Sequence, residues 1–259
     1  MWLPDLSHLS PVRLAKRPDD RAAHPGWNQC FRWRDQQPRA NSWAVGDPQL
    51  RSLLPTFLQV EAVIWQGGQV QELPPLPGDA DGGAAAINDN GDAVGFTGCV
   101  TGAVHAILWQ HGKPIDLGSL GGVTGNFAFD ISNRGEVVGQ SDLPADTTHH
   151  AFLWTKDDGM QDLGTLPGIP GSVANGINNK GQAVGFSDDF EGNTVALLWQ
   201  NRVMTDLNTL IPPNSPLFLL EALSINDRGQ IAGFGHLANG EHRGFVLTPS
   251  QGEAPLNQE

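Results

Sequence analysis

The stretch HAFLWTKDDGMQDLG, at residues 150–164, decides the fold of this chain. An Asp-Asp-Gly corner separates two runs that contain apolar residues, and this pattern predicts a β-hairpin. The stretch also holds a histidine, a tryptophan and three acidic residues, which are the residue types of a catalytic or binding site. Whether it serves architecture or chemistry depends on how often the same pattern occurs elsewhere in the chain.

The tryptophan of this hairpin recurs at a regular interval. Related segments read AVIWQGGQVQEL, AILWQHGKPIDL and ALLWQNRVMTDL, and a fifth copy, GFVLTP at 244–249, has Leu247 at the tryptophan position. Because aliphatic or aromatic residues flank each copy, we expect these side chains to fill the seams between sheets rather than to stack on sugar rings. We also expect Trp109, Trp154 and Trp199 to occupy equivalent buried positions. The four tryptophans are spaced 44, 45 and 45 residues apart: Trp65, Trp109, Trp154 and Trp199.

A second hairpin element lies between the tryptophan segments. Its four copies read AINDNGDAVGF, DISNRGEVVGQ, GINNKGQAVGF and SINDRGQIAGF, and their isoleucines are spaced 44, 46 and 48 residues apart. Asn and Asp tolerate turn geometry, and a glycine supplies the positive φ that such a turn needs. The predicted turn glycines are Gly91, Gly135, Gly181 and Gly229.

Two hairpins in each 44–48 residues give four strands per unit, which is the signature of a propeller blade. No apolar stripe of helical period runs through the repeat, and glycine recurs within every segment that would have to be helical. The sequence therefore predicts an all-β, propeller-like array of four-stranded antiparallel blades, with four to five blades and an incomplete array as one form. No helix longer than two turns is expected in residues 56–250.

Counting strands leaves the closure of the array open. The pattern predicts 17 strands, whereas four closed blades need 16 and five need 20. A four-bladed ring would form if the hairpins at 61–73 and 222–235 shared one blade. The other outcome is an open arc, with residues 1–50 poorly packed and with unpaired strand edges that favour association with a partner or another copy.

Charge and composition divide the chain into a basic start and an acidic repeat region. Residues 1–55 hold eight of the fifteen Lys and Arg and five of the 28 Asp and Glu, a net charge of +3, which leaves −16 for the rest. We expect residues 1–55 to be a degenerate blade, a disordered extension or the product of a start site that misses the natural N-terminus. Residues 56–250 form the repeat domain, and residues 251–259 are expected to be a disordered tail.

The composition also limits the classes of partner. A strongly negative surface repels phosphate backbones, so we expect no nucleic acid partner. No run of about 18 apolar residues occurs, so no membrane insertion is expected. The N-terminus has no apolar core of a signal peptide. Cys30 and Cys99 allow one disulfide at most, and the sequence leaves open whether they pair.

The repeats resemble the HAF family of extracellular repeats. The tripeptide of the family name stands at 150–152, the segment ISNRGEVVG at 131–139 and the segment DLGTLPG at 162–168 follow its other patterns, and the resemblance covers about residues 56–250. It implies a β-propeller-like protein located outside the cell or in the cell envelope. It implies no established reaction.

The candidate sites in the sequence have structural explanations. His105 and His150 stand at equivalent positions, but the other copies have Glu61, Val195 and Arg243 there, and a catalytic or metal-binding histidine would need fixed partners. The NDNGD segment at 88–92 is similar to part of a calcium loop. We expect its turns to bind no calcium, because the other copies replace ligand positions with Arg134, Lys180 and Arg228.

Two further segments are weaker candidates. We expect the acidic segment DDFEGN, at 188–193, to be an ordinary loop. We also expect a loop at the Gly-rich segment GSLGGVTGN, at 118–126, because it lacks the lysine and the helix of a phosphate-binding loop. Acidic residues are numerous, so the sequence leaves open whether two of them form the carboxylate pair of a glycosidase. No catalytic residue, metal site or cofactor is predicted.

These observations favour a non-enzymatic repeat scaffold that binds an unidentified protein or glycan, located outside the cell or in the envelope by resemblance. The alternative is a secreted carbohydrate-binding protein or carbohydrate-active enzyme that uses the central cavity of the propeller. A repeat fragment without an independent function is a third reading. An enzyme should show two carboxylates converging in one pocket, with aromatic side chains nearby.

Overall fold

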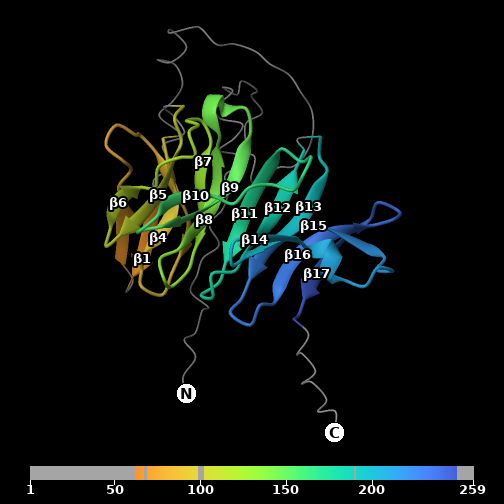
Figure 1. Cartoon of the computed structure of the whole chain (residues 1–259). Coiled ribbons are helices and arrows are strands. Elements are labelled where there is room, and N and C mark those ends of the chain that lie inside the picture. The colour runs from red at the N-terminus through yellow and green to blue at the C-terminus, as the bar shows by residue number, and fades with distance from the viewer. Residues whose placement is uncertain (1–61, 67–68, 99–101, 190, 250–259) are drawn as a thin grey trace, which may run out of the picture.

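The computed structural model describes residues 62–66, 69–98, 102–189 and 191–249. Within these residues the chain forms 17 strands in five antiparallel sheets and no α-helix, which confirms the predicted all-β, blade-like repeat (Figure 1). Short strands alternate with tight turns because Gly, Asn and Asp, which favour turns, recur between the apolar runs. We number the sheets 1 to 5 along the chain.

The first and last sheets have fewer strands than the three between them. Sheet 1 consists of β1 (Ala62–Gln66) and β2 (Gln69–Leu73). Sheet 5 consists of β15 (Leu217–Ile225), β16 (Ile231–Leu237) and β17 (His242–Leu247).

Sheets 2, 3 and 4 each contain four strands in sequence order. Sheet 2 consists of β3 (Gly82–Ile87), β4 (Ala93–Thr97), β5 (His105–Gln110) and β6 (Lys113–Asp116). Sheet 3 consists of β7 (Asn126–Ile131), β8 (Val137–Asp142), β9 (His149–Thr155) and β10 (Gly159–Asp162). Sheet 4 consists of β11 (Gly171–Ile177), β12 (Ala183–Asp188), β13 (Thr194–Gln200) and β14 (Val203–Asp206).

Two short 3₁₀ helices complete the described elements. They are η2 (Pro144–Asp146), between β8 and β9, and η3 (Leu207–Leu210), after β14. Neither of these helices has the length and apolar character that a membrane crossing requires.

Neighbouring sheets pack through the same kind of apolar contact four times. We call the face of a sheet that contacts the next sheet its following face, and the face that contacts the previous sheet its preceding face. The following face of sheet 2 contributes Val94, Ala106 and Leu108, which pack on residues of the preceding face of sheet 3, including Val137 and Phe152. The same pattern joins sheets 1 and 2, sheets 3 and 4, and sheets 4 and 5.

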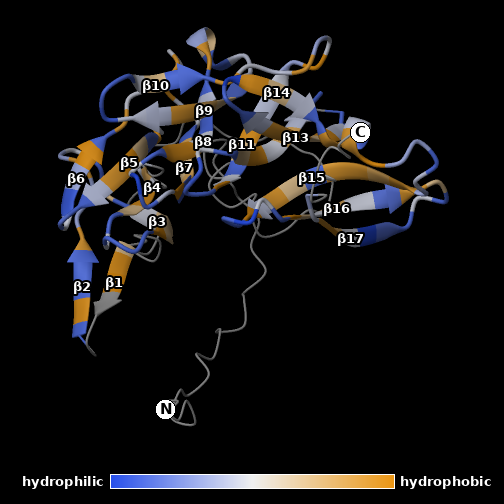
Figure 2. Ribbon diagram, turned by 60° about the horizontal axis from the view of Figure 1, so that its bottom comes forward, coloured by the Kyte–Doolittle hydropathy of each residue, from blue (hydrophilic) through white to orange (hydrophobic). Residues whose placement is uncertain are grey.

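The array is an open arc within the described residues. Sheet 1 and sheet 5 are separate sheets, so the shared blade that four-bladed closure requires does not form. Figure 2 shows β1 and β2 at one end of the arc and β15, β16 and β17 at the other. The expectations for residues 1–55 and 251–259, and the pairing of Cys30 with Cys99, fall outside the described residues.

A second set of glycines, in the middle of the second strand of each unit, has a role that the turn pattern does not predict. In β12, a Cβ on Gly185 would overlap the carbonyl oxygen of Val173 on the adjacent strand. The strand β11 shifts register between Ala174 and Gly176, and this bulge brings the two backbones close together. The glycines at the equivalent position of the other units approach the backbone of the adjacent strand in the same way: Gly95, Gly139 and Gly233.

Candidate functional site

The Asn/Asp-x-Gly turns are built by a side chain that caps its own turn. In sheet 4, Asn178 Oδ1 accepts hydrogen bonds from the backbone N–H groups of Lys180 (3.0 Å) and Gln182 (3.1 Å). Gly181 follows with a φ of 73°. The corresponding turns in the other sheets have the same pair of bonds and a glycine with positive φ; they begin at Asn88, Ser132 and Asn226.

The second residue of each turn links neighbouring sheets. Backbone N–H groups donate to the side chain of the next turn along the array, from Asp89 to Asn133 (2.9 Å), from Asn133 to Asn179 (2.6 Å) and from Asn179 to Asp227 (2.8 Å). The amide of Asn179 also donates to Asp227, and these bonds lower the pKa of that carboxyl group. In the NDNGD segment, the carboxylate of Asp89 also accepts a hydrogen bond from the amide of Asn133 (2.6 Å), so this carboxylate links two sheets.

This ladder of turns was not foreseen as a contact between sheets. The signal was present, because Asn or Asp occupies the second turn position in all four copies. A capping function within one turn needs only the first residue and the glycine. The recurrence of an amide or carboxylate beside them therefore points to a further partner.

The tryptophans lie at equivalent places in the strand register. Trp109 and Trp199 stand opposite Ala93 and Ala183, are buried, and donate their indole N–H to the carbonyl oxygens of Pro74 (2.7 Å) and Leu163 (3.1 Å), respectively. A buried ring face is not available to stack on a sugar.

Trp154 departs from the predicted burial, because it is only half-buried. It stands opposite Val137, and a valine leaves less room for the indole than the alanine found opposite the other two tryptophans. It still packs against the apolar contact between sheets 2 and 3. The backbone of Trp65 pairs with Val70 in sheet 1, and its side chain lies outside the described residues.

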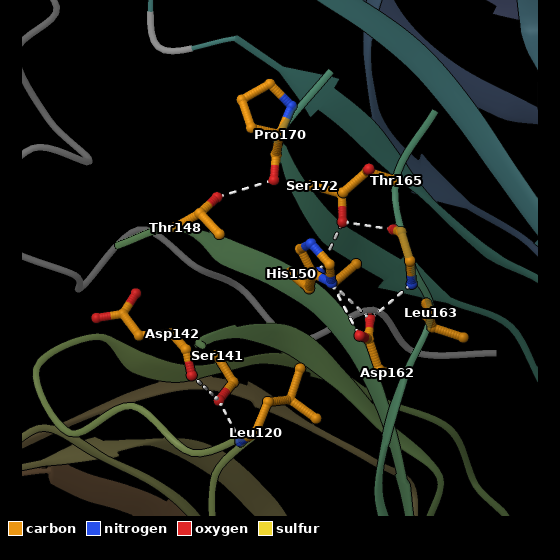
Figure 3. Close-up of polar contacts among 12 residues, drawn as sticks. Leu120, Ser141, Asp142, Thr148, His150, Asp162, Leu163, Thr165, Pro170 and Ser172 are labelled. Carbon is orange, nitrogen blue, oxygen red and sulfur yellow. Dashed lines mark hydrogen bonds and ion pairs between the residues drawn. The ribbon is translucent and has the colours of Figure 1, made fainter. Parts of the chain in front are cut away.

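His150, Asp162 and Ser172 lie close together and have the residue types of a nucleophilic triad (Figure 3). His150 Nδ1 lies 2.9 Å from both oxygens of Asp162, and Asp162 also accepts the backbone N–H of Gly164 at 2.7 Å. Ser172 is fully buried; its Oγ accepts from Ala151 N (2.8 Å) and donates to Gly164 O (2.7 Å). The serine hydroxyl therefore links β9 to the segment that follows β10, and it is not exposed to a substrate.

The remaining predicted candidates differ from His150. His105 stands at the equivalent position, but its buried Nδ1 forms no hydrogen bond within the described residues and lies 3.5 Å from the carboxylate of Asp79. In the segment DDFEGN, Asp189 Oδ1 accepts from the backbone of Glu191 (2.9 Å) and Asn193 (3.0 Å), so it caps its own loop. Among the residues that the structure describes, no group of three or more His, Cys, Asp and Glu is placed to hold a metal ion.

Four titratable residues of sheets 3, 4 and 5 interact in sequence; we call Asp142, His149, Asp188 and Glu221 the acidic cluster. Asp142 and Asp188 end the second strands of sheets 3 and 4, His149 begins β9, and Glu221 lies within β15. His149 Nε2 lies 3.2 Å from Asp188 Oδ1. Burial, and then the negative charge of Asp146, raise the pKa of Asp142. Burial, and then the negative charge of Asp188, raise the pKa of Glu221 to about 7. Burial is the largest cause in both cases, so the fold disfavours the ionised forms of these two carboxyl groups.

Glu221→Gln is expected to flatten the dependence of stability on pH. The folded chain binds the Glu221 proton more tightly than the unfolded chain, so the stabilisation is complete below the ordinary pKa of 4.5 and is lost as the pH rises through about 7. Urea denaturation at a series of pH values measures this slope, with the exposed Glu72→Gln as the control. Equal slopes for the wild-type chain and Glu221→Gln would contradict the environment described for Glu221.

A cleft of about 240 Å³ lies between sheets 3 and 4. Its lining includes Gln161, Trp199, Gln200, Asn201 and Arg202. Asn201 and Arg202 form the turn between β13 and β14 with φ values of 53° and 65°, a region that favours glycine. The corresponding turns have Gly112 and Gly159, so a strained arginine at the rim of a cleft is a feature of sheet 4.

Comparisons with known proteins give the chain a neighbour in structure but no family. No family model matches the chain, and no curated protein matches it. A crystal structure of a triple arginine-to-alanine mutant of AofleA from Arthrobotrys oligospora is similar to this chain at 13% sequence identity and a TM-score of 0.34. That similarity covers 74% of this chain and 79% of the other.

Proposed function

We propose that this chain is a non-enzymatic repeat scaffold whose acidic cluster and the loops around it bind a protein partner with a basic surface. We place it outside the cell or in the cell envelope, on the resemblance of its motifs to HAF repeats. Rigid repeated elements that carry variable loops are a common basis for binding surfaces. Here the repeated polar residues fasten turns and sheets, while the loops 143–148, 189–193 and 238–241 differ from one sheet to the next.

The observation that carries this proposal is that a histidine is the basic side chain beside the three carboxyl groups of the acidic cluster. In the described part of the chain no lysine or arginine forms an ion pair with Asp142, Asp188 or Glu221. Two of these carboxyl groups have a raised pKa, which means that their ionised forms lack stabilisation. A cationic group brought by a partner would supply it, and complementary charge also speeds association.

A titration of the full chain with an oligolysine peptide tests this proposal. We expect binding that weakens as salt is added and strengthens between pH 6 and pH 8, since Glu221 ionises around its pKa of about 7. The double variant Asp188→Asn, Glu221→Gln should weaken binding more than the double variant Asp157→Asn, Glu72→Gln. Both variants change the net charge equally, so an equal loss of binding would show a general charge effect and overturn the proposal.

Carbohydrate binding is the second candidate, and the cleft beside Trp199 favours it. Arg202 and the amide groups of Gln161, Gln200 and Asn201 are donors and acceptors that suit sugar hydroxyls. A glycan array compares the wild-type chain with Arg202→Gly, which removes the guanidinium group and suits the positive φ of the turn. Loss of a glycan signal in this variant supports the candidate, and a wild-type chain without any signal argues against it.

A further inference from the structure

The following face of sheet 5 is exposed, whereas the same face of every inner sheet is covered. A valine in the second strand of sheets 2, 3 and 4 is completely buried by the next sheet, and Ala232 takes this position in β16 and is exposed. Val246 in β17 takes the position of Leu198 and is 68% exposed. Sheet 5 also exposes Phe218 and Leu223. The three buried valines are Val94, Val138 and Val184.

The opposite end of the arc exposes the complementary face. Val63 in β1 stands at the position of Ile107, Phe152 and Leu197, which are fully buried against the preceding sheet, yet Val63 is 39% exposed. Val70 in β2 stands where methionines pack in sheets 3 and 4, and it is 48% exposed. The described residues thus end in a following face without a next sheet and a preceding face without a previous one.

We propose that the following face of sheet 5 docks on the preceding face of sheet 1 in a second copy of this chain, head to tail. The interface would continue one that the chain already forms four times between its own sheets. Apolar strand positions that are buried at each inner contact are exposed only where the array ends. Such a contact joins two different surfaces, so it is heterologous and builds a ring or an extended assembly.

Charge decides how this assembly responds to salt. Each copy has a formal net charge of −13, so two copies repel each other at low ionic strength. The apolar contact itself does not depend on opposite charges. We therefore expect association to strengthen as salt screens the repulsion. The alternative is that the basic residues 1–55 of the same chain cover the end of the acidic array. In that case the contact between residues 1–55 and the array would weaken as salt is added, and the chain would stay monomeric.

Three single variants of the full chain test the contact. Val246→Asp places a charge on the following face of sheet 5, and Val63→Asp places one on the preceding face of sheet 1. Val203→Asp is the matched control, because Val203 is 61% exposed in β14 and lies on neither end face. All three positions are exposed, so thermal unfolding should show that each variant folds. Sedimentation velocity over a wide range of protein concentration measures association.

The head-to-tail contact predicts a distinctive result on mixing. The wild-type chain and Val203→Asp should associate in moderate salt, and Val246→Asp or Val63→Asp alone should stay monomeric. An equimolar mixture of the last two should form a complex of two chains and nothing larger, because each supplies the face that the other lacks. A wild-type chain that stays monomeric overturns the proposal. So does a Val63→Asp variant that still associates, since that would show a symmetric contact between two copies of sheet 5.

Discussion

Trp199→Ala is expected to lower the free energy of unfolding by about 3–5 kcal/mol, the range for removal of a large buried aromatic side chain. Trp199 is 3% exposed and packs with Leu197 and Ala183 in the contact between sheets 3 and 4. The substitution also leaves the carbonyl oxygen of Leu163 without its indole donor. Urea denaturation monitored by circular dichroism measures the change.

Trp154→Ala is the control for this experiment. It removes the same side chain from the equivalent strand position, but Trp154 is only half-buried and stands opposite a valine. We therefore expect a smaller loss of stability than for Trp199→Ala. If Trp199→Ala kept its stability and lost binding to a glycan, the tryptophans would be functional residues and the packing account would be wrong.

Gly185→Ala is expected to cost at least about 3 kcal/mol, the upper part of the range for overpacking, because the new methyl group meets backbone rather than a flexible side chain. The added Cβ would overlap the carbonyl oxygen of Val173 in the adjacent strand. Relief requires the two strands to separate where β11 already bulges. The expected result is a large fall in the midpoint of urea denaturation, or a chain that fails to fold.

Gly181→Ala separates this effect from the usual cost of losing a glycine. Gly181 has a positive φ in the turn before β12, and a side chain there meets only the carboxylate of Glu136, at ordinary contact distance. An alanine in the left-handed region costs about 1–2 kcal/mol. If Gly181→Ala destabilised the chain as much as Gly185→Ala, the close approach of the two strands would not be the cause.

The contrast between these two glycines shows how far the sequence could take the fold. Gly181 was predicted as a turn residue because an Asn/Asp-x-Gly pattern favours a turn without any contact from elsewhere in the chain. Gly185 recurs just as regularly, but its role depends on a bulge in the adjacent strand, and that bulge is a property of the pairing. The number of strands and their grouping into blades followed from local patterns, and the closure of the array did not.

The site was harder to predict for a related reason. His150 was interpreted as structural from the valine at an equivalent position, and its proximity to Asp162 and Ser172 was not predicted. The acidic cluster was missed because His149 and Asp188 are 39 residues apart and Glu221 comes from a third sheet. Each residue is unremarkable in its own segment. Their proximity depends on the stacking of sheets, which a single repeat does not encode.

The open arc is the central claim of this account, and the distance between its two ends tests it most directly. Spin labels at Val70→Cys and Val246→Cys, with Cys30 and Cys99 replaced by serine, report this distance by pulsed electron paramagnetic resonance on dilute protein. We predict a separation well above about 20 Å, twice the spacing of two packed sheets. A separation of about 10 Å, the spacing of neighbouring blades, would show that the ends meet in a closed ring and would contradict the account.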